Sequence, residues 1–159
     1  MSEHVRLEKG KISELLVISE LLQNGLEVYT PVIDTGIDCV VKSKTKPTKY
    51  FELQIKGTKH NVSIRGGKKV KDHAKNNPNY FLVFVSDKKK ESSVPDIFYL
   101  NGEQQIEDYC SKKKKDGTIS LHISIPKRNE YVETQGFDKL VEKIKFCLPA
   151  QSIPCSHNL

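Results

Sequence analysis

The sequence lacks the features that mark membrane, secreted and zinc-binding proteins. Its 159 residues contain no run of about 18 apolar residues, the length that a membrane-spanning helix needs. The N-terminus lacks the charged-then-apolar layout of a signal peptide. The four cysteines form no Cys-x-x-Cys pair and have no zinc-type spacing with the five histidines. We therefore expect a reduced, cytoplasmic protein that does not bind a membrane.

The length and composition favour one globular domain. Hydrophobic residues make up 36% of the chain and charged residues 29%, a balance that suits a polar globular protein. Domains typically contain about 100–150 residues, and we find no internal repeat or domain boundary. We expect a single domain over residues 1–148 and a flexible C-terminal tail over residues 149–159.

Basic residues are concentrated in one part of the chain. Residues 42–75 hold eleven Lys or Arg and two acids, whereas the rest of the sequence has more acids than bases. A local basic field of this kind suits a polyanion such as DNA or RNA, although solvated hairpin and loop lysines would give the same pattern. The candidate nucleic-acid-binding residues are Lys42, Lys59, Arg65, Lys68, Lys69 and Lys71.

Hydrophobic periodicity predicts an α/β protein. The expected helices cover residues 10–24, 69–76, 102–113 and 136–148. The expected strands cover residues 27–33, 37–42, 50–56, 62–65, 80–85, 96–100 and 118–125. The run at 80–85 is entirely apolar, which is typical of a strand covered on both faces. An antiparallel start followed by a buried strand predicts a central mixed β-sheet flanked by helices on both faces.

The expected strand at 50–56 has one apolar face and one polar face. Glu52, Gln54 and Lys56 occupy alternate positions, so their side chains share a face, and apolar residues fill the positions between them. Asp38 lies in the strand before it. An aspartate, then a carboxylate or amide, then a lysine two residues later are the groups that a metal-dependent phosphodiesterase site needs.

A further acid lies in the first expected helix. Placing residues at about 100° per position puts Glu14 near the middle of an apolar arc that includes Val17, Ile18 and Leu21. A glutamate in a buried stripe is costly unless something pairs with it. A helix followed by three strands can bring Glu14 to the same site as Asp38.

These residues suit a hard divalent cation, because such ions prefer oxygen ligands. Asp38 would be the main ligand, the side-chain carbonyl of Gln54 and the backbone carbonyl of Ile55 would be further ligands, and Glu14 would act through water. The metal would activate water for hydrolysis of a phosphodiester, and Lys56 would stabilise the developing charge or orient the water.

The same residues carry a resemblance to a known superfamily. The matching positions are Gly10, Glu14, Val17, Leu21, Gly25, Gly36-Ile37-Asp38 and Gln54-Ile55-Lys56-Gly57. Their layout over about residues 10–85 resembles the core of the PD-(D/E)XK nuclease superfamily, and is close to that of archaeal Holliday-junction resolvases and small prokaryotic endonuclease-like domains. The resemblance implies a restriction-endonuclease-like fold, a Mg²⁺- or Mn²⁺-dependent activity and catalytic roles for Glu14, Asp38, Gln54 and Lys56.

Gln54 departs from the commoner glutamate of this superfamily. A neutral amide binds a hard cation less strongly than a carboxylate does. Glu52, an extra acid on the same face, and Asp34, in the preceding turn, are second-tier candidates. Glu52 lies about 13 Å along the strand from Lys56, because each residue rises about 3.3 Å.

Three functional hypotheses follow from these patterns. The first is a homodimeric, metal-dependent endonuclease acting on DNA, branched or junction DNA included, without a small-molecule cofactor. The second is a nuclease-fold module that binds nucleic acid but has lost cleavage, which Gln54 favours and the intact Asp38 and Lys56 oppose. The third is a protein-interaction domain whose lysines only keep it in solution.

Overall fold

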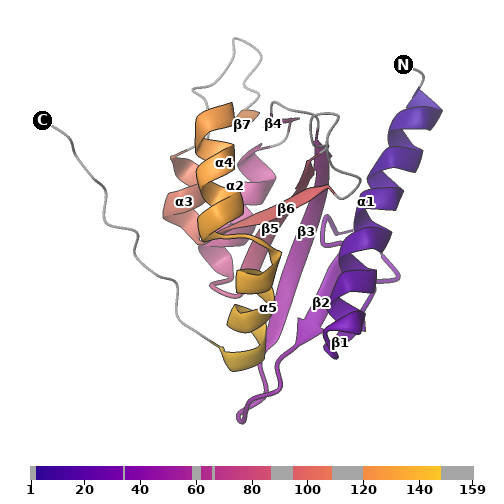
Figure 1. Cartoon of the computed structure of the whole chain (residues 1–159), viewed down its shortest axis with the longest axis vertical. Helices are drawn as coiled ribbons and strands as arrows, with labels where there is room; N and C mark the ends of the chain where they lie inside the picture. The colour runs from indigo at the N-terminus through magenta and orange to yellow at the C-terminus, as the bar shows by residue number, and fades with distance from the viewer. Residues whose placement is uncertain are drawn as a thin grey trace, which may run out of the picture.

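The computed structural model describes residues 3–33, 35–58, 62–65, 67–86, 95–108 and 120–147 (Figure 1). The helices are α1 (Glu3–Gln23), α2 (Gly67–Asn76), α3 (Glu103–Glu107), α4 (Ile125–Thr134) and α5 (Phe137–Phe146). The strands are β1 (Glu27–Tyr29), β2 (Cys39–Lys42), β3 (Tyr50–Thr58), β4 (Val62–Arg65), β5 (Tyr80–Ser86), β6 (Asp96–Asn101) and β7 (Ser120–Ile123). The expected tail over 149–159 lies outside these residues.

The main sheet has five strands in the order β1-β2-β3-β5-β6. β3 and β5 run parallel, with Gln54 opposite Leu82, and the other neighbouring pairs are antiparallel. β4 and β7 form a separate antiparallel pair. The predicted mixed sheet is therefore confirmed, and β1 and β6 are its edge strands.

Helices cover the sheet on both faces, as predicted. On one face, α1 and α5 pack their apolar side chains against the inward positions of β2, β3 and β5, and Figure 1 shows these two helices in front of the sheet. On the other face, α2, α3 and α4 form a second core with β5 and β6. Every residue of β5 is buried, because both cores meet at this strand.

Helix α1 lies close against β3 at Gly57. A Cβ atom built on Gly57 would lie 2.4 Å from Ser13 Oγ, so any larger residue here requires Ser13 to move. The helix ends at Gln23 and the chain turns at Gly25, whose φ of 72° suits glycine. The Gly25 N–H donates to the Leu22 carbonyl and the Leu26 N–H to the Leu21 carbonyl, which closes the last turn. Leu26 is then buried under the helix.

Several boundaries differ from the sequence predictions. The first helix begins at Glu3 rather than residue 10, the strand expected at 27–33 covers only Glu27–Tyr29, and the helix expected at 102–113 covers only Glu103–Glu107 within the described residues. Helix α4 was not predicted, because its sequence is mostly polar and Arg128 and Tyr131 are the buried ones among its described side chains. No helix in the described part of the chain has the length and apolarity to cross a membrane.

Candidate functional site

The candidate site lies beside β3 at the start of β2. The two strands pair from Lys42 opposite Tyr50 to Cys39 opposite Leu53, and β2 begins only at Cys39 because Gly36, with a φ of 88°, turns the chain before it. Before Cys39 the strand pairing of β2 with β3 stops, and the Asp38 side chain bonds the β3 backbone at Ile55 instead.

The carboxylate of Asp38 binds the main chain of β3. Its Oδ2 atom accepts a hydrogen bond from the Ile55 N–H at 2.5 Å, and the Asp38 N–H donates to the Leu53 carbonyl oxygen at 2.9 Å. The N–H and C=O of one strand residue point to the same neighbouring strand, so the Ile55 carbonyl also faces this edge. The structure therefore brings the two predicted oxygen donors, Asp38 and the Ile55 carbonyl, to one edge of β3.

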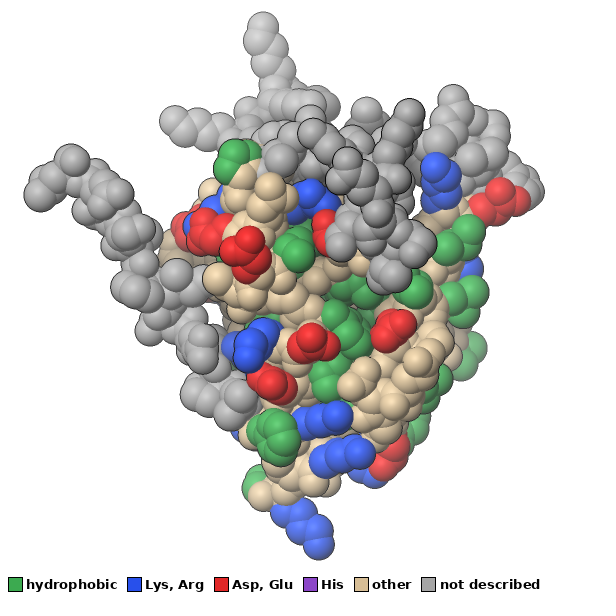
Figure 2. Space-filling view, viewed as in Figure 1, with side chains coloured by type: hydrophobic (Ala, Val, Ile, Leu, Met, Phe, Trp, Pro, Cys, Tyr) green, Lys and Arg blue, Asp and Glu red, His purple; other side chains and the backbone are tan. Residues whose placement is uncertain are grey.

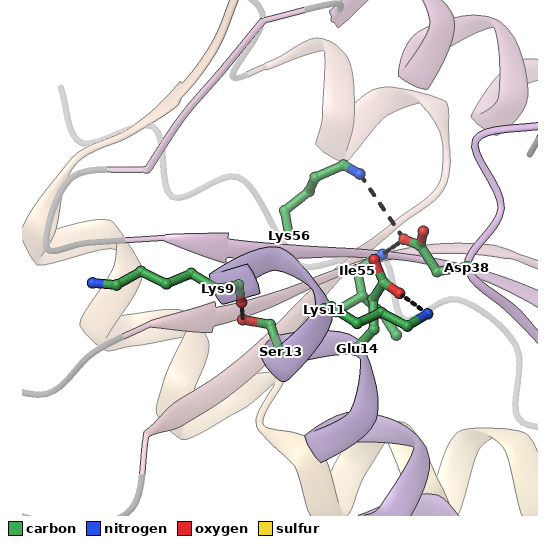
Figure 3. Close-up of polar contacts among 7 residues, drawn as sticks. All are labelled: Lys9, Lys11, Ser13, Glu14, Asp38, Ile55 and Lys56. Atoms are coloured by element: carbon green, nitrogen blue, oxygen red, sulfur yellow. Dashed lines mark hydrogen bonds and ion pairs between the residues drawn. The ribbon is translucent and has the colours of Figure 1, made fainter. Parts of the chain in front are cut away.

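Lys56 lies next to Asp38. Its Nζ atom is 3.9 Å from Asp38 Oδ2, and both side chains are partly buried (Figure 3). Lys56 and Gln54 project from the polar face of β3, whereas the Ile55 side chain packs into the core beneath α1.

Glu14 reaches the same region from helix α1. It forms an ion pair with Lys11 at 2.7 Å, and this contact, helped by the more distant Asp38 carboxylate, raises the pKa of Lys11. Burial raises the pKa of Cys39 to about 12, and the charges of Asp38 and Glu14 add to this rise. The carboxylates of Asp38 and Glu14 thus both raise the pKa of Cys39. Figure 3 shows both carboxylates directed toward β3 at Ile55.

Gln54 has a different set of contacts. Its Oε1 atom accepts a hydrogen bond at 2.6 Å from the hydroxyl of Tyr80 on β5, a side chain whose burial raises its pKa. The Gln54 Nε2 atom faces Gly36, where an added Cβ would lie 3.8 Å away. The Gln54 oxygen is therefore held on the β5 side of β3, and its role as a metal ligand stays a prediction.

The second-tier and basic candidates are more dispersed. Glu52 lines a separate cavity beside α2, while Asp34 and Lys59 lie outside the described residues, and only the backbone of Arg65 is described. Lys68 and Lys69 are exposed on α2.

Two further basic candidates are engaged within the protein. Lys42 pairs with Glu27 at 2.9 Å, and Lys71 forms an ion pair with Glu107. The positive charge of each is therefore partly balanced by an acid of the same chain.

Two contacts of the site were missed by sequence reasoning. Lys11 lies three residues before Glu14, a helical spacing that predicts an ion pair, so this contact could have been found. The bond from Tyr80 to Gln54 depends on the register of β3 with β5, which no local pattern gives.

The donor set can be tested against a divalent cation. In the described ranges, no group of three His, Cys, Asp or Glu side chains is arranged to hold a metal ion. The donors at the start of β2 are instead the Asp38 carboxylate and the Ile55 main-chain carbonyl, with the Glu14 carboxylate nearby. All are oxygens, and they fit an ion such as Mg²⁺, which typically binds one or two carboxylates and keeps several waters.

Comparison with solved structures identifies the fold. The chain has a restriction-endonuclease-like fold, a five-stranded mixed sheet with helices. It is similar to Hjc, a Holliday junction resolvase from the hyperthermophilic archaeon Archaeoglobus fulgidus, with a TM-score of 0.54 and 10% identity over 87% of this chain and 98% of that one. It is also similar to the bacterial homing endonuclease I-Ssp6803I, with a TM-score of 0.54 and 13% identity over 90% of this chain and 95% of that one. No family model and no curated protein matches the sequence.

Proposed function

We propose that this protein is a divalent-metal-dependent endonuclease that hydrolyses phosphodiester bonds of DNA, branched or junction DNA included. The observation that carries the proposal is the start of β2, where Asp38, the Ile55 carbonyl and Lys56 meet at one edge of β3. An anionic ligand, a neutral oxygen and a cation at one point can engage a metal and a phosphate together. The fold shared with a resolvase and a homing endonuclease supports this assignment.

The residues have distinct proposed roles. Asp38 and the Ile55 carbonyl would hold Mg²⁺ or Mn²⁺, with the Gln54 amide oxygen as a further ligand and Glu14 acting through water. When bound, such an ion lowers the pKa of its water and neutralises charge on the phosphate. Lys56 would stabilise the negative charge that develops on the phosphate, and its ammonium is already held at this edge by Asp38.

The basic residues would bind the DNA backbone. Lys68 and Lys69 are exposed on α2, which makes them available to phosphates. Lys42, Lys59, Arg65 and Lys71 complete the proposed set. Because contacts to phosphates release counterions, the affinity for DNA should fall steeply with salt concentration.

Two contacts favour a second candidate function, a nuclease-fold module that binds nucleic acid without cleaving it. Tyr80 holds the Gln54 oxygen, and Lys11 holds the Glu14 carboxylate. If these bonds persist with substrate, Gln54 and Glu14 are withdrawn from the metal, and Asp38, which itself accepts the Ile55 N–H and lies 3.9 Å from Lys56, is the remaining proposed side-chain ligand. The module would then bind DNA through its lysines alone.

We also propose a homodimer. Ile12, Leu15 and Leu22 share one side of α1 and are each more than half exposed, and Figure 2 shows hydrophobic side chains gathered along the α1 side of the molecule. Two-fold dimers are the commonest assembly, and two copies of one site can cut both strands. Sedimentation should give twice the 18.1 kDa monomer mass for the natural chain and the monomer for Leu15→Asp. A natural chain that stays monomeric at tens of micromolar would exclude the dimer.

A cleavage assay tests the proposed function. Supercoiled plasmid and a four-way junction are incubated with Mg²⁺ or Mn²⁺ and either the natural chain, Asp38→Ala or the control Glu20→Ala, which removes an acid far along α1. Cutting by the natural chain and Glu20→Ala but not by Asp38→Ala supports the endonuclease. Salt-sensitive DNA binding without cutting supports the module, and the absence of any binding rejects both.

A further inference from the structure

A cavity of about 700 Å³ lies beside the candidate site, between α2 and the start of β3. Helix α2 contributes Lys69, Asp72, His73 and Asn76, whose spacing of three, four and seven residues places them on one side of the helix. Glu52 contributes from the polar face of β3. The volume falls within the range of small-ligand pockets, about 300–1,000 Å³.

The cavity adjoins the proposed cleavage site. Ile37, the residue before Asp38, lines it, and Glu52 is two residues from Gln54, about 7 Å along β3. Gly36 separates the two places, because an added Cβ there would lie 3.8 Å from Gln54 Nε2 and 3.9 Å from His73 Nε2. A nucleotide whose phosphate lay at Asp38 would have its neighbouring groups within reach of this cavity.

The polar groups of the cavity suit a base rather than a phosphate. The cavity's two acids, Glu52 and Asp72, outnumber its one lysine, Lys69, so the lining is net negative and disfavours phosphate. The carboxylates can accept hydrogen bonds from amino groups, as carboxylates do from the amino group of cytosine. Asn76 and Asn77 supply amides, the group that pairs with the adenine edge. These groups favour a base that donates from an exocyclic amino group.

His73 adds a flat surface. Its ring stacks on the buried Tyr80 ring, with centroids 5.6 Å apart and planes 16° apart, and the same histidine lines the cavity. Tyr80 therefore fixes the plane of His73, and unpaired bases stack on such rings in single-strand-binding proteins. A base paired inside a duplex shows only its edge, so a base that enters a cavity must be unpaired or extruded.

We propose that this cavity binds an unpaired adenine, cytosine or guanine of the substrate strand next to the bond to be cut. The inference rests on the proposed nuclease function and gives it a substrate class, namely DNA with unpaired bases near the cleavage point. It also assigns a role to Glu52, which lies too far from Lys56 to share in the chemistry there.

Binding without cleavage tests the proposal. The natural chain in EDTA is titrated into fluorescent 12-mers of dA, dC or dT and into an abasic 12-mer of the same length. We expect dA and dC to bind at least fivefold more tightly than dT, and the abasic strand no more tightly than dT. In Glu52→Ala and Asp72→Ala this preference should fall below twofold, whereas Glu20→Ala keeps it, and thermal melts confirm that each variant folds.

The result is decided by the ratio of the affinities for the different oligonucleotides, not by any one affinity. Removing any acid strengthens the electrostatic attraction to every oligonucleotide. If Glu52→Ala and Asp72→Ala bind all the oligonucleotides more tightly but keep the natural chain's preference for dA and dC over dT, the cavity proposal is overturned. Equal binding of all four strands by the natural chain would also overturn it, while leaving cleavage untouched. Loss of all DNA binding would instead reject the proposed function together with this inference.

Discussion

The hydroxyl of Tyr80 donates a hydrogen bond to Oε1 of Gln54 at 2.6 Å, linking the two central parallel strands through the polar face of β3. Because Tyr80 is fully buried and its ring is stacked on His73, the hydroxyl has little freedom to leave. The orientation of the Gln54 amide is thus set from β5, on the opposite side of β3 from Asp38.

Replacement of Gln54 by Glu should strengthen metal binding. The variant keeps an acceptor for Tyr80 and adds a negative charge near Asp38, and hard cations prefer carboxylates to amides. We expect the dissociation constant for Mn²⁺, measured by calorimetry, to fall about tenfold, which is about 1.4 kcal/mol. Gln54→Ala, which leaves the Tyr80 hydroxyl without its partner, should weaken binding, and unchanged affinity in both variants would exclude Gln54 from the metal site.

Replacement of Gly57 by Ala should push α1 away from β3. The new methyl group would meet Ser13, whose Oγ is held by a hydrogen bond to the Lys9 carbonyl oxygen, and overpacking of this kind costs about 1–3 kcal/mol. Urea unfolding should show this loss. Adding Ser13→Ala should restore part of it, because the nearest remaining atom, the Ser13 Cβ, would be 3.3 Å away.

Gly10 provides the matched control for this prediction. It also lies in α1, but an added Cβ there meets nothing within 4 Å. Gly10→Ala should therefore stabilise the protein by about 0.5–1 kcal/mol through helix propensity. A Gly57→Ala variant as stable as Gly10→Ala would contradict the close approach of α1 to β3.

The ion pair between Asp96 and Arg128 should contribute strongly to stability. The side chains are 13% and 9% exposed and 2.5 Å apart, and they join β6 to α4. Asp96→Ala leaves a nearly buried guanidinium unpaired, which costs about 3–5 kcal/mol. The exposed pair of Lys139 and Glu142 is the control, and Lys139→Ala should change the urea unfolding free energy by less than about 1 kcal/mol.

Alkaline pH should destabilise the protein through Cys39. Its pKa is raised from 9.0 to about 12 in the folded chain, so the unfolded chain loses this proton first. The contribution to stability is full below pH 9 and is lost as pH rises toward 12, at up to about 1.4 kcal/mol per pH unit. Between pH 8 and pH 10, Cys39→Ala should lose less unfolding free energy than the natural chain, and equal losses would argue against a protected thiol.

Local patterns were sufficient to predict much of the fold. The alternation of β3, the wholly apolar β5 and the apolar arc of α1 each reflect burial of one or two faces, and the structure confirms all three elements. Helix α4 was not predicted because the side chains it buries are Arg128 and Tyr131 rather than aliphatic residues. Its arginine pairs with Asp96, 32 residues earlier, and hydrophobic periodicity does not detect such a pairing.

The candidate site was predicted less completely. The spacing of Asp38, Gln54 and Lys56 gave the residues, and strand pairing placed Asp38 and Lys56 together. Strand alternation does not give the direction of the Gln54 oxygen, because Tyr80 sets it through a register between segments that are 26 residues apart. Strand alternation also does not show that Glu52 lines a separate cavity, because that cavity is formed by the packing of α2 beside β3.

The bond from the Ile55 amide to Asp38 makes one nuclear magnetic resonance signal a reporter of the whole site. This amide proton faces a titratable side chain rather than a fixed carbonyl of a neighbouring strand. Its chemical shift will therefore depend on the charge of Asp38. Its rate of exchange with solvent will depend on how long the hydrogen bond to the Asp38 carboxylate persists. Protonation, cation binding and substrate entry can each be read at residue 55 without a label on the ligand.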